Sequence, residues 1–269
     1  MTKITTDLTT HQEGMSMNGA QRMFADKAGR VAINELDDQD NLITSRVRKT
    51  NFDLSVLKQA VAEQNLEKYG LRVGDYKTIN GHDYVIAGLN CMKGSHNYTC
   101  TSDHVGLIVI PHTTQVWNAS GNTAQGADDR GAGYLNCDLH YYLKNTLLPL
   151  VETDLGAANL LGHYKLLSNA VADGKSSDWT WESDCKICAL SEVQVYGSVV
   201  WGNMYDVGEA DQQLEVFQHF KHTAIFGNEY PWLRAVVSAS SAAFASYYGG
   251  ANATTASYAC CVAALILFH

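Results

Sequence analysis

The longest apolar segment of the chain spans residues 260–268, with the sequence CCVAALILF. It is roughly half the ~20 residues that a membrane-spanning helix needs, so it predicts a buried β-strand. A lone apolar strand must pair to satisfy its backbone groups. The strongest partner signal is Asn80-Gly81, which predicts a two-residue β-hairpin between strands at residues 75–79 and 82–88. We therefore expect the hairpin and the apolar strand, at residues 262–268, to share one antiparallel sheet.

Other segments predict a mixture of strands and helices. Strands are expected at residues 105–110, 190–195 and 198–201, and helices at residues 139–147 and 212–220, with a helical or irregular segment at residues 160–172 and a Gly-rich, Ala-rich and Asp-rich loop at residues 120–133. Strands outnumber helices, and long irregular connections separate them. The regular strand–helix alternation of a parallel sheet is absent, so the pattern predicts an α+β fold with antiparallel sheets.

The first 70 residues predict a separate organisation. Residues 1–50 are polar and have no sustained hydrophobic period, which is typical of an arm that is flexible or ordered by a partner. Residues 51–70 predict a helix that Asp53 caps and Gly70 ends, with Leu54, Leu57 and Val61 on one face. This helix either packs on its own domain or associates with a second copy of the chain. The remaining residues, 71–269, form the predicted globular domain.

Composition and charge limit the classes of partner. The chain is 46% hydrophobic and 17% charged, which is enough apolar material for a real core. Its formal net charge of −9 argues against nucleic acid and against insertion into anionic membranes. Seven cysteines without a signal peptide in residues 1–14 predict free thiols in a protein made in a reducing cytoplasm.

The sequence contains no convincing catalytic or metal-binding motif. Gly174-Lys175-Ser176 lacks the earlier glycine of a phosphate-binding loop, because Asn169 stands at that position. Cys185 and Cys188 have metal-ligand spacing but no second pair, so we expect buried thiols. His219 and His222 lack the glutamate of a zinc hydrolase. We therefore expect no catalytic residue, no metal and no cofactor, and we interpret the chain as a binding protein and not an enzyme.

The most informative segment is the tail, residues 235–261, which carries no charged side chain. It is rich in Ala, Ser and Tyr, and Gly249-Gly250 argues against one continuous helix. Tyr, Ser, Gly and Asn are the residues of adaptable binding surfaces, since Tyr contributes rigid contact area and the small residues hydrogen-bond without bulk.

Five residue types are missing from residues 235–269. Lys, Glu, Gln, Met and Trp occur 44 times in residues 1–234, so about six or seven would be expected in the last 35 residues by proportion. Random change at the two adenines of the asparagine codon AAC can produce every residue type found there and none of these five. This pattern is typical of a segment diversified at adenines.

The C-terminal region resembles the variable proteins diversified by retroelements. The similar features are Tyr230-Pro231-Trp232-Leu233-Arg234, the small-residue stretch with Phe244 and Gly249, the hairpin region at residues 69–88, and Leu190-Ser191-Glu192 with Gly197. The resemblance covers roughly residues 70–269. At residues 261–264 the chain departs from the Gly-Val-Arg-Pro that often precedes the last strand in that family.

The resemblance implies a C-type-lectin-like fold, related to the formylglycine-generating enzyme fold, that displays variable side chains on a rigid scaffold. Phage members of the family are receptor-binding proteins of the tail fibre, and cellular members are displayed on the cell surface. The expected ligand is a protein or another cell-surface molecule. Two alternatives stay open: a structural virion protein whose lectin-like domain serves assembly only, and a catalytic relative of the formylglycine-generating enzymes. For the latter, the adjacent Cys260 and Cys261 are poorly placed to bind one copper ion together.

The expected ligand-binding residues all lie in the diversified tail. They are Ser240, Ser241, Ala242, Ser246, Tyr247, Tyr248, Asn252, Ala253, Thr254, Thr255, Tyr258 and Cys260. The large apolar side chains of the same region should point inward as core anchors. These are Val236, Val237, Phe244, Leu265 and Leu267.

Overall fold

The computed structural model describes residues 21–25, 31–35, 50, 52–94, 100–120, 132–203, 212–248 and 250–269. It divides into two compact units, Met1–Arg46 and Val47–His269. Within the first unit, β1 (Gln21–Ala25) and β2 (Val31–Glu35) form an antiparallel pair. The sequence had predicted no regular element in this part of the chain.

The first helix of the second unit is shorter than predicted. Helix α1 (Leu54–Ala62) stops well before Gly70, which instead ends a short 3-10 helix, η1 (Glu67–Tyr69), with a left-handed φ of 70°. Leu57, Ala60 and Val61 are buried in the core of this unit. The apolar face of α1 therefore packs on its own domain.

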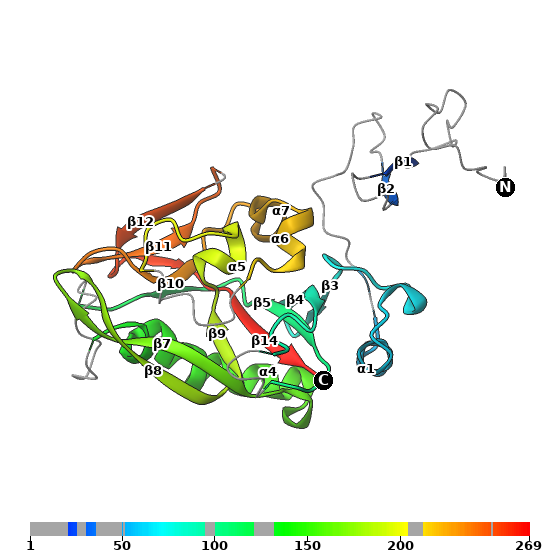
Figure 1. Ribbon diagram of the computed structural model, residues 1–269, viewed down its shortest axis with the longest axis horizontal. Helices are drawn as coiled ribbons and strands as arrows, with labels where there is room; N and C mark the ends of the chain where they lie inside the picture. Colours follow the sequence, from blue (N-terminus) through cyan, green and yellow to red (C-terminus); the bar gives the residue numbers. More distant parts are fainter. Residues whose placement is uncertain are drawn as a thin grey trace. The chain divides into compact units, whose positions relative to one another are not determined.

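A five-stranded antiparallel sheet forms the centre of the second unit (Figure 1). Its strands, in spatial order, are β3 (Tyr76–Ile79), β4 (His82–Leu89), β5 (Val105–Ile110), β14 (Ala264–Phe268) and β9 (Ile187–Ala189). The hairpin turns at Asn80-Gly81, where both residues have positive φ. The predicted pairing is confirmed, since β14 and the hairpin share this sheet.

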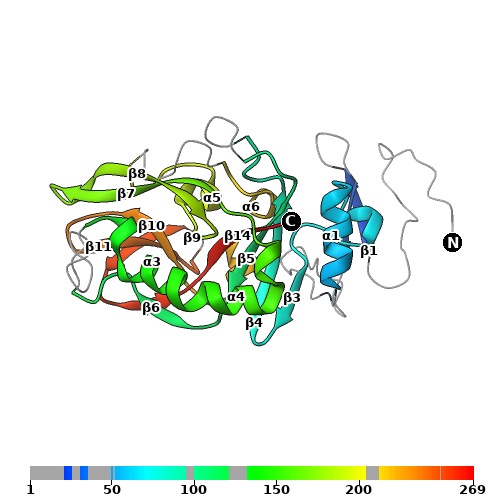
Figure 2. The ribbon, with the colours of Figure 1, turned by 90° about the horizontal axis from the view of Figure 1, so that it is seen from below.

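Helices cover both faces of the central sheet. Side chains alternate along β14: Ile266 and Phe268 join one core cluster, and Leu265 and Leu267 join the other. The first face carries η3 (Tyr134–Asn136), α3 (Asp138–Tyr142), η4 (Leu143–Leu147), α4 (Leu148–Leu155) and η5 (Ala157–Asn159). Figure 2 shows α3 and α4 running along this side of the sheet. The second face carries α5 (Glu192–Tyr196), α6 (Glu215–His219) and α7 (His222–Phe226).

Two sequence predictions were wrong. Residues 160–172 are neither helical nor irregular, because β7 (His163–Ala172) pairs with β8 (Lys175–Cys185) in a long hairpin. Its turn is Asp173-Gly174, with φ of 51° and 76°, a hairpin signal that the sequence carries. Residues 192–196 form α5 and no strand, and β9 lies immediately before them. A capping box between Ser191 and Gln194 starts this helix.

A third prediction, the strand at residues 198–201, was also wrong, and the remaining predictions agree with the structure in outline. The helices at residues 139–147 and 212–220 are present, the second as α6. Residues 198–201 contain no strand, and most of the loop at residues 120–133 lies outside the described residues. A two-stranded pair joins β6 (Thr114–Val116) to β13 (Ala259–Cys261). The fold is thus α+β with antiparallel sheets. No helix of the described residues is long and apolar enough to span a membrane.

Candidate ligand-binding site

The tail builds a separate three-stranded antiparallel sheet (Figure 1, upper left). Its strands are β10 (Trp232–Val236), β11 (Ser241–Ala245) and β12 (Ala251–Thr255), in that spatial order. β10 and β11 are largely buried, whereas β12 is an edge strand with no fully buried residue. The sheet therefore presents one strand and its flanking turns at the surface.

Packing on both faces explains why β11 is made of small residues. On one face, Trp232, Val236 and Ala242 belong to the first core cluster. On the other face, Leu233, Ala243 and Ala245 belong to the second cluster. A strand buried on both sides leaves little volume for side chains. The Ala-rich composition of this part of the tail is therefore a packing requirement.

Nine of the twelve expected ligand-binding residues reach the surface. Ser240, Tyr247, Tyr248, Asn252 and Tyr258 are exposed, and Ser241, Ala253, Thr254 and Thr255 are half-buried. Three are buried and cannot touch a ligand in this structure: Ala242, Ser246 and Cys260. Ala242 lies in the middle strand, and Cys260 pairs with Gln115 of β6. The carbonyl oxygen of Ser246 lies 2.8 Å from Nε2 of His222, which fixes this residue inside the turn.

The core anchors are confirmed in part. Val236, Leu265 and Leu267 are buried, as predicted, whereas Val237 and Phe244 are half-buried. Phe244 is the second of five aromatic rings in a row that leads from the core to the surface. The ring centroid of Phe244 lies 6.3 Å from that of Trp232 and 6.0 Å from that of Tyr230.

The outer end of the aromatic row is formed by two tyrosines in the β11–β12 turn. Tyr230 lies 6.3 Å from Tyr247 between ring centroids, and Tyr247 lies 4.0 Å from Tyr248. Their two hydroxyl oxygens are 2.6 Å apart. Exposure rises along the row from 1% at Trp232 to 83% at Tyr248. Such a row gives the exposed rings a rigid support, which a binding surface requires.

The third exposed tyrosine is at the other end of β12. Tyr258 follows the strand, and its backbone N–H donates to the carbonyl oxygen of Thr255. Five residues at a rise of ~3.3 Å separate the ends of the strand by about 13 Å. The structure therefore does not bring Tyr258 into one cluster with Tyr247 and Tyr248, which corrects the expectation of a single group of three.

A surface segment outside the tail lies beside β12. Val200 and Trp201 are 50% and 47% exposed, and the indole Nε1–H of Trp201 donates to the carbonyl oxygen of Ala251 over 3.3 Å. The carboxylate of Glu192, which is buried, accepts the backbone N–H groups of Val200, Trp201 and Gly202 at 2.9–3.1 Å. One buried carboxylate thus holds two exposed apolar side chains in place. No sequence pattern had marked them.

Local groups satisfy part of the free edge of β12. The carbonyl oxygen of Ala251 accepts from Trp201, and the N–H of Ala253 donates to Oδ1 of Asn252 at 2.8 Å. Side chains that close an edge strand oppose pairing with another strand. This arrangement favours ligand contact through exposed side chains over addition of a ligand strand to the sheet.

A cavity of about 480 Å³ adjoins the other turn of the tail. It lies where the β7–β8 turn meets the β10–β11 turn, and its lining is Val171, Asp173, Gly174, Lys175, Val237, Ser238 and Ala239. A Cβ added to Gly174 would lie 2.9 Å from the backbone nitrogen of Ala239, so glycine is required for this close approach. Asp173 and Lys175 are the charged side chains that line the cavity.

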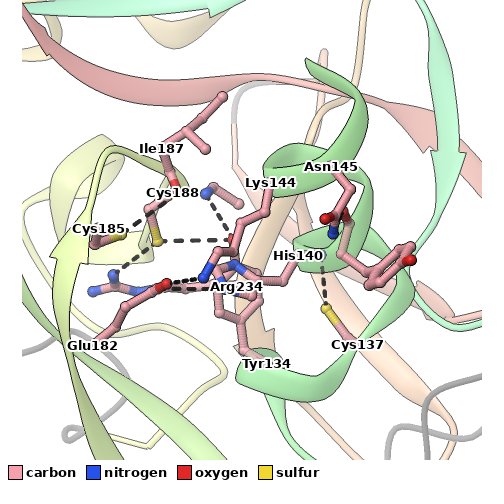
Figure 3. A network of polar contacts seen from close by, with 12 residues as sticks. Tyr134, Cys137, His140, Lys144, Asn145, Glu182, Cys185, Ile187, Cys188 and Arg234 are labelled. Carbon is pink, nitrogen blue, oxygen red and sulfur yellow. Dashed lines mark hydrogen bonds and ion pairs between the residues drawn. The ribbon is translucent and has the colours of Figure 1, made fainter. Parts of the chain in front are cut away.

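Cys185 and Cys188 belong to a buried polar network that includes Arg234 of β10 (Figure 3). Cys185 and Cys188 are free and buried, as the sequence predicted. His219 and His222 lie on separate helices, and each has its own partner: Glu215 at 3.5 Å and the carbonyl oxygen of Ser246. Among the described residues, no group of three or more His, Cys, Asp or Glu side chains is arranged to hold a metal ion.

Comparisons with protein-family models, curated proteins and solved structures found no match to this chain. A functional interpretation therefore rests on the residues and geometry described above.

Proposed function

We propose that this chain is a ligand-binding display protein whose diversified tail contacts the ligand. This proposal rests on the way the tail residues divide between the buried core and the exposed surface. Its strand β11 is buried on both faces, while Tyr247, Tyr248 and Asn252 project from the adjoining turn and edge strand. A rigid support beneath exposed, uncharged, chemically varied side chains is what a diversified binding surface needs.

The proposed binding surface combines the exposed tail residues with two exposed side chains from outside the tail, which Glu192 holds in place. We define it as Ser240, Ser241, Tyr247, Tyr248, Asn252, Ala253, Thr254, Thr255 and Tyr258, together with Val200 and Trp201. Aromatic side chains are the residues that most often dominate binding energy. Tyr247, Tyr248 and Trp201 are therefore the proposed hot spots.

We further propose a C-type-lectin-like fold and a role in a phage virion, as a receptor-binding protein of the tail fibre or surface. The support is the α+β architecture with antiparallel sheets, the resemblance of residues 70–269 to retroelement-diversified proteins, and the residue types missing after residue 234. The ligand would be a protein or another molecule on a cell surface, and the proposed function requires no cofactor.

The DNA that flanks the coding sequence tests this proposal. A diversified tail requires a near-copy of its last ~100 bases that differs only at adenines, beside a gene for a reverse transcriptase. Finding both supports the display function. A genome that carries neither overturns the diversification proposal and leaves a fixed surface, as expected of a structural virion protein whose lectin-like domain serves assembly.

A further inference from the structure

The cavity of about 480 Å³ lies between two turns from different parts of the chain (Figure 1, left). One wall is the β7–β8 turn, outside the tail, and the other is the β10–β11 turn, inside it. Gly174 and Ala239 mark the closest approach of the two turns. Sites for small molecules commonly have volumes of roughly 300–1,000 Å³. The cavity is therefore large enough for a small ligand, and none of its lining residues belongs to the binding surface proposed above.

Each wall contributes one apolar side chain that the core supports from behind. Val171, in the first wall, is half-buried and packs against the first core cluster. Val237, in the second wall, is half-buried and packs against the second cluster. Their remaining surface is open to the cavity, so an apolar group placed between them would remove it from water.

The first wall also carries one charge of each sign. Asp173 and Lys175 are both exposed and both line the cavity. Within the described ranges of the chain, neither side chain forms an ion pair. The carboxylate of Asp173 can only accept hydrogen bonds, and the ammonium of Lys175 can only donate them. In the opposite wall, the backbone N–H of Ala239 has no hydrogen-bond partner among the residues that the structure describes, so it is a further donor.

This pair of charges selects against ligands that carry a single charge. An anion that approaches Lys175 also meets the like charge of Asp173, and a cation that approaches Asp173 also meets Lys175. A ligand with both charges finds an opposite partner for each. The ammonium and the carboxylate of an α-amino acid are attached to one carbon, which suits two side chains that stand two positions apart on one turn.

We propose that this cavity binds a small zwitterion, of the class of α-amino acids with an apolar side chain. The ammonium of the ligand contacts Asp173, and its carboxylate contacts Lys175 and the N–H of Ala239. Its side chain lies between Val171 and Val237. Because exposed ion pairs contribute little, L-leucine, with about nine non-hydrogen atoms, should bind with a Kd on the order of 1 mM.

The wall from the tail gives the site a variable part, and this step alone rests on the proposed function. Val237, Ser238 and Ala239 lie in the diversified tail, whereas the charged pair lies outside it. Changes in the tail would alter which apolar side chain fits, while the requirement for both charges stays. Binding of a zwitterion does not need diversification. Failure to bind leucine and a tail that never varies are therefore separate results, and each refutes only its own proposal.

Titration of the isotope-labelled full chain with three probes, followed through the NMR signals of the backbone amides, tests the proposal. The probes are L-leucine, 4-methylpentanoate, which lacks the ammonium, and 3-methylbutylamine, which lacks the carboxylate. We expect leucine to shift the amides of residues 171–175 and 237–239, with near saturation at about 10 mM, tenfold above the expected Kd. Each of the other probes should bind up to about fivefold more weakly, which is the contribution of one exposed ion pair.

Two variants assign each charge of the ligand to its partner. Asp173→Asn keeps a residue that tolerates the positive φ of 51°. It should weaken binding of leucine and of 3-methylbutylamine, but not of 4-methylpentanoate. Lys175→Gln should weaken binding of leucine and of 4-methylpentanoate, but not of 3-methylbutylamine. Lys58→Gln, at an exposed position of α1, is the matched control and should leave the affinity for all three probes unchanged.

Three results would overturn the proposal. The first is the absence of a saturable shift with leucine at about 10 mM, or shifts that lie outside the two turns. The second is an equal affinity for the three probes, which would show that the charges of the cavity do not select the ligand. The third is an affinity for leucine that neither charge variant changes. The first two results come from the wild-type protein, so they do not depend on the folding of a variant.

Discussion

The indole N–H of Trp201 donates to the carbonyl oxygen of Ala251 over 3.3 Å, which joins a side chain from outside the tail to the tail's own edge strand. This contact exists because Glu192 holds the backbone of residues 200–202. The proposed binding surface therefore has a fixed part, and its geometry depends on a carboxylate that never reaches the solvent.

Replacing Glu192 by alanine should release this segment. Three backbone N–H groups lose a charged acceptor, and hydrogen bonds to charged groups contribute about 1.5–3 kcal/mol each, partly offset here by new bonds to water. We expect the unfolding free energy to fall by about 2–4 kcal/mol. The amides of residues 200–202 should exchange faster with deuterium. Glu215→Ala, on an exposed helix face, is the control: it should change the unfolding free energy by less than about 0.5 kcal/mol, through its exposed contact with His219, and leave the exchange of residues 200–202 unchanged. Unaltered exchange in Glu192→Ala would contradict the proposed role.

A second buried carboxylate, that of Asp154 on α4, forms hydrogen bonds with the β3–β4 hairpin. Its oxygens lie 2.7 Å from Nδ2 of Asn80, 2.8 Å from Nδ1 of His82 and 2.5 Å from the hydroxyl of Tyr84. Asp154→Ala leaves the buried Tyr84 hydroxyl without this acceptor, so we expect a loss of about 2–4 kcal/mol in urea unfolding. Tyr84→Phe removes one bond and should cost about 1 kcal/mol. Equal costs for the two variants would contradict the assignment of Asp154 as a shared acceptor.

The central sheet could be predicted from the sequence because its apolar segments and its turn residues each fit only a strand or a hairpin. Residues 105–110 and 264–268 are apolar on both faces, and Asn80-Gly81 permits a two-residue turn. The strand predicted at residues 190–195 was wrong because a short segment that mixes apolar residues with polar ones fits a strand as well as a helix. The capping box between Ser191 and Gln194 decided the outcome. The strand at residues 163–172 is indicated only by the turn signal of Asp173-Gly174 that follows it.

The exposed part of the tail could be predicted as a segment but not residue by residue. Ala242 and Ala253 have the same side chain, yet the first is fully buried and the second half-exposed. Their difference follows from the position of each strand in the sheet, which composition cannot supply. The link between Glu192 and Trp201 joins residues nine apart through backbone N–H groups, and no residue pattern records such a bond.

His112 predicts a pH-dependent contribution to stability. Its Nδ1 lies 2.8 Å from Glu229 and its Nε2 3.0 Å from Asp83. The hydrogen bond to Glu229, with help from Asp83 and against partial burial, raises the pKa of His112 above 6.5. Because the folded pKa is raised, the stabilisation is fully present below pH 6.5. It is lost as pH rises through the folded value.

His112→Asn, which keeps a residue that tolerates the positive φ of 50°, measures this contribution. The variant should be destabilised more at pH 5 than at pH 8, by less than about 1 kcal/mol because the site is half exposed. Glu229→Gln should remove most of the same pH dependence. An equal destabilisation at the two pH values would show that the His112 ring contributes packing but no stability that depends on its protonation.

The most direct test of the display function is to sequence the tail codons in many independent lineages of the source population. We predict amino-acid changes, arising at adenines, at the exposed Tyr247, Tyr248 and Asn252, and conserved codons for Trp232 and Arg234, the buried residues just before the tail. Changes spread evenly over exposed and buried codons, or a tail that never varies, would contradict it.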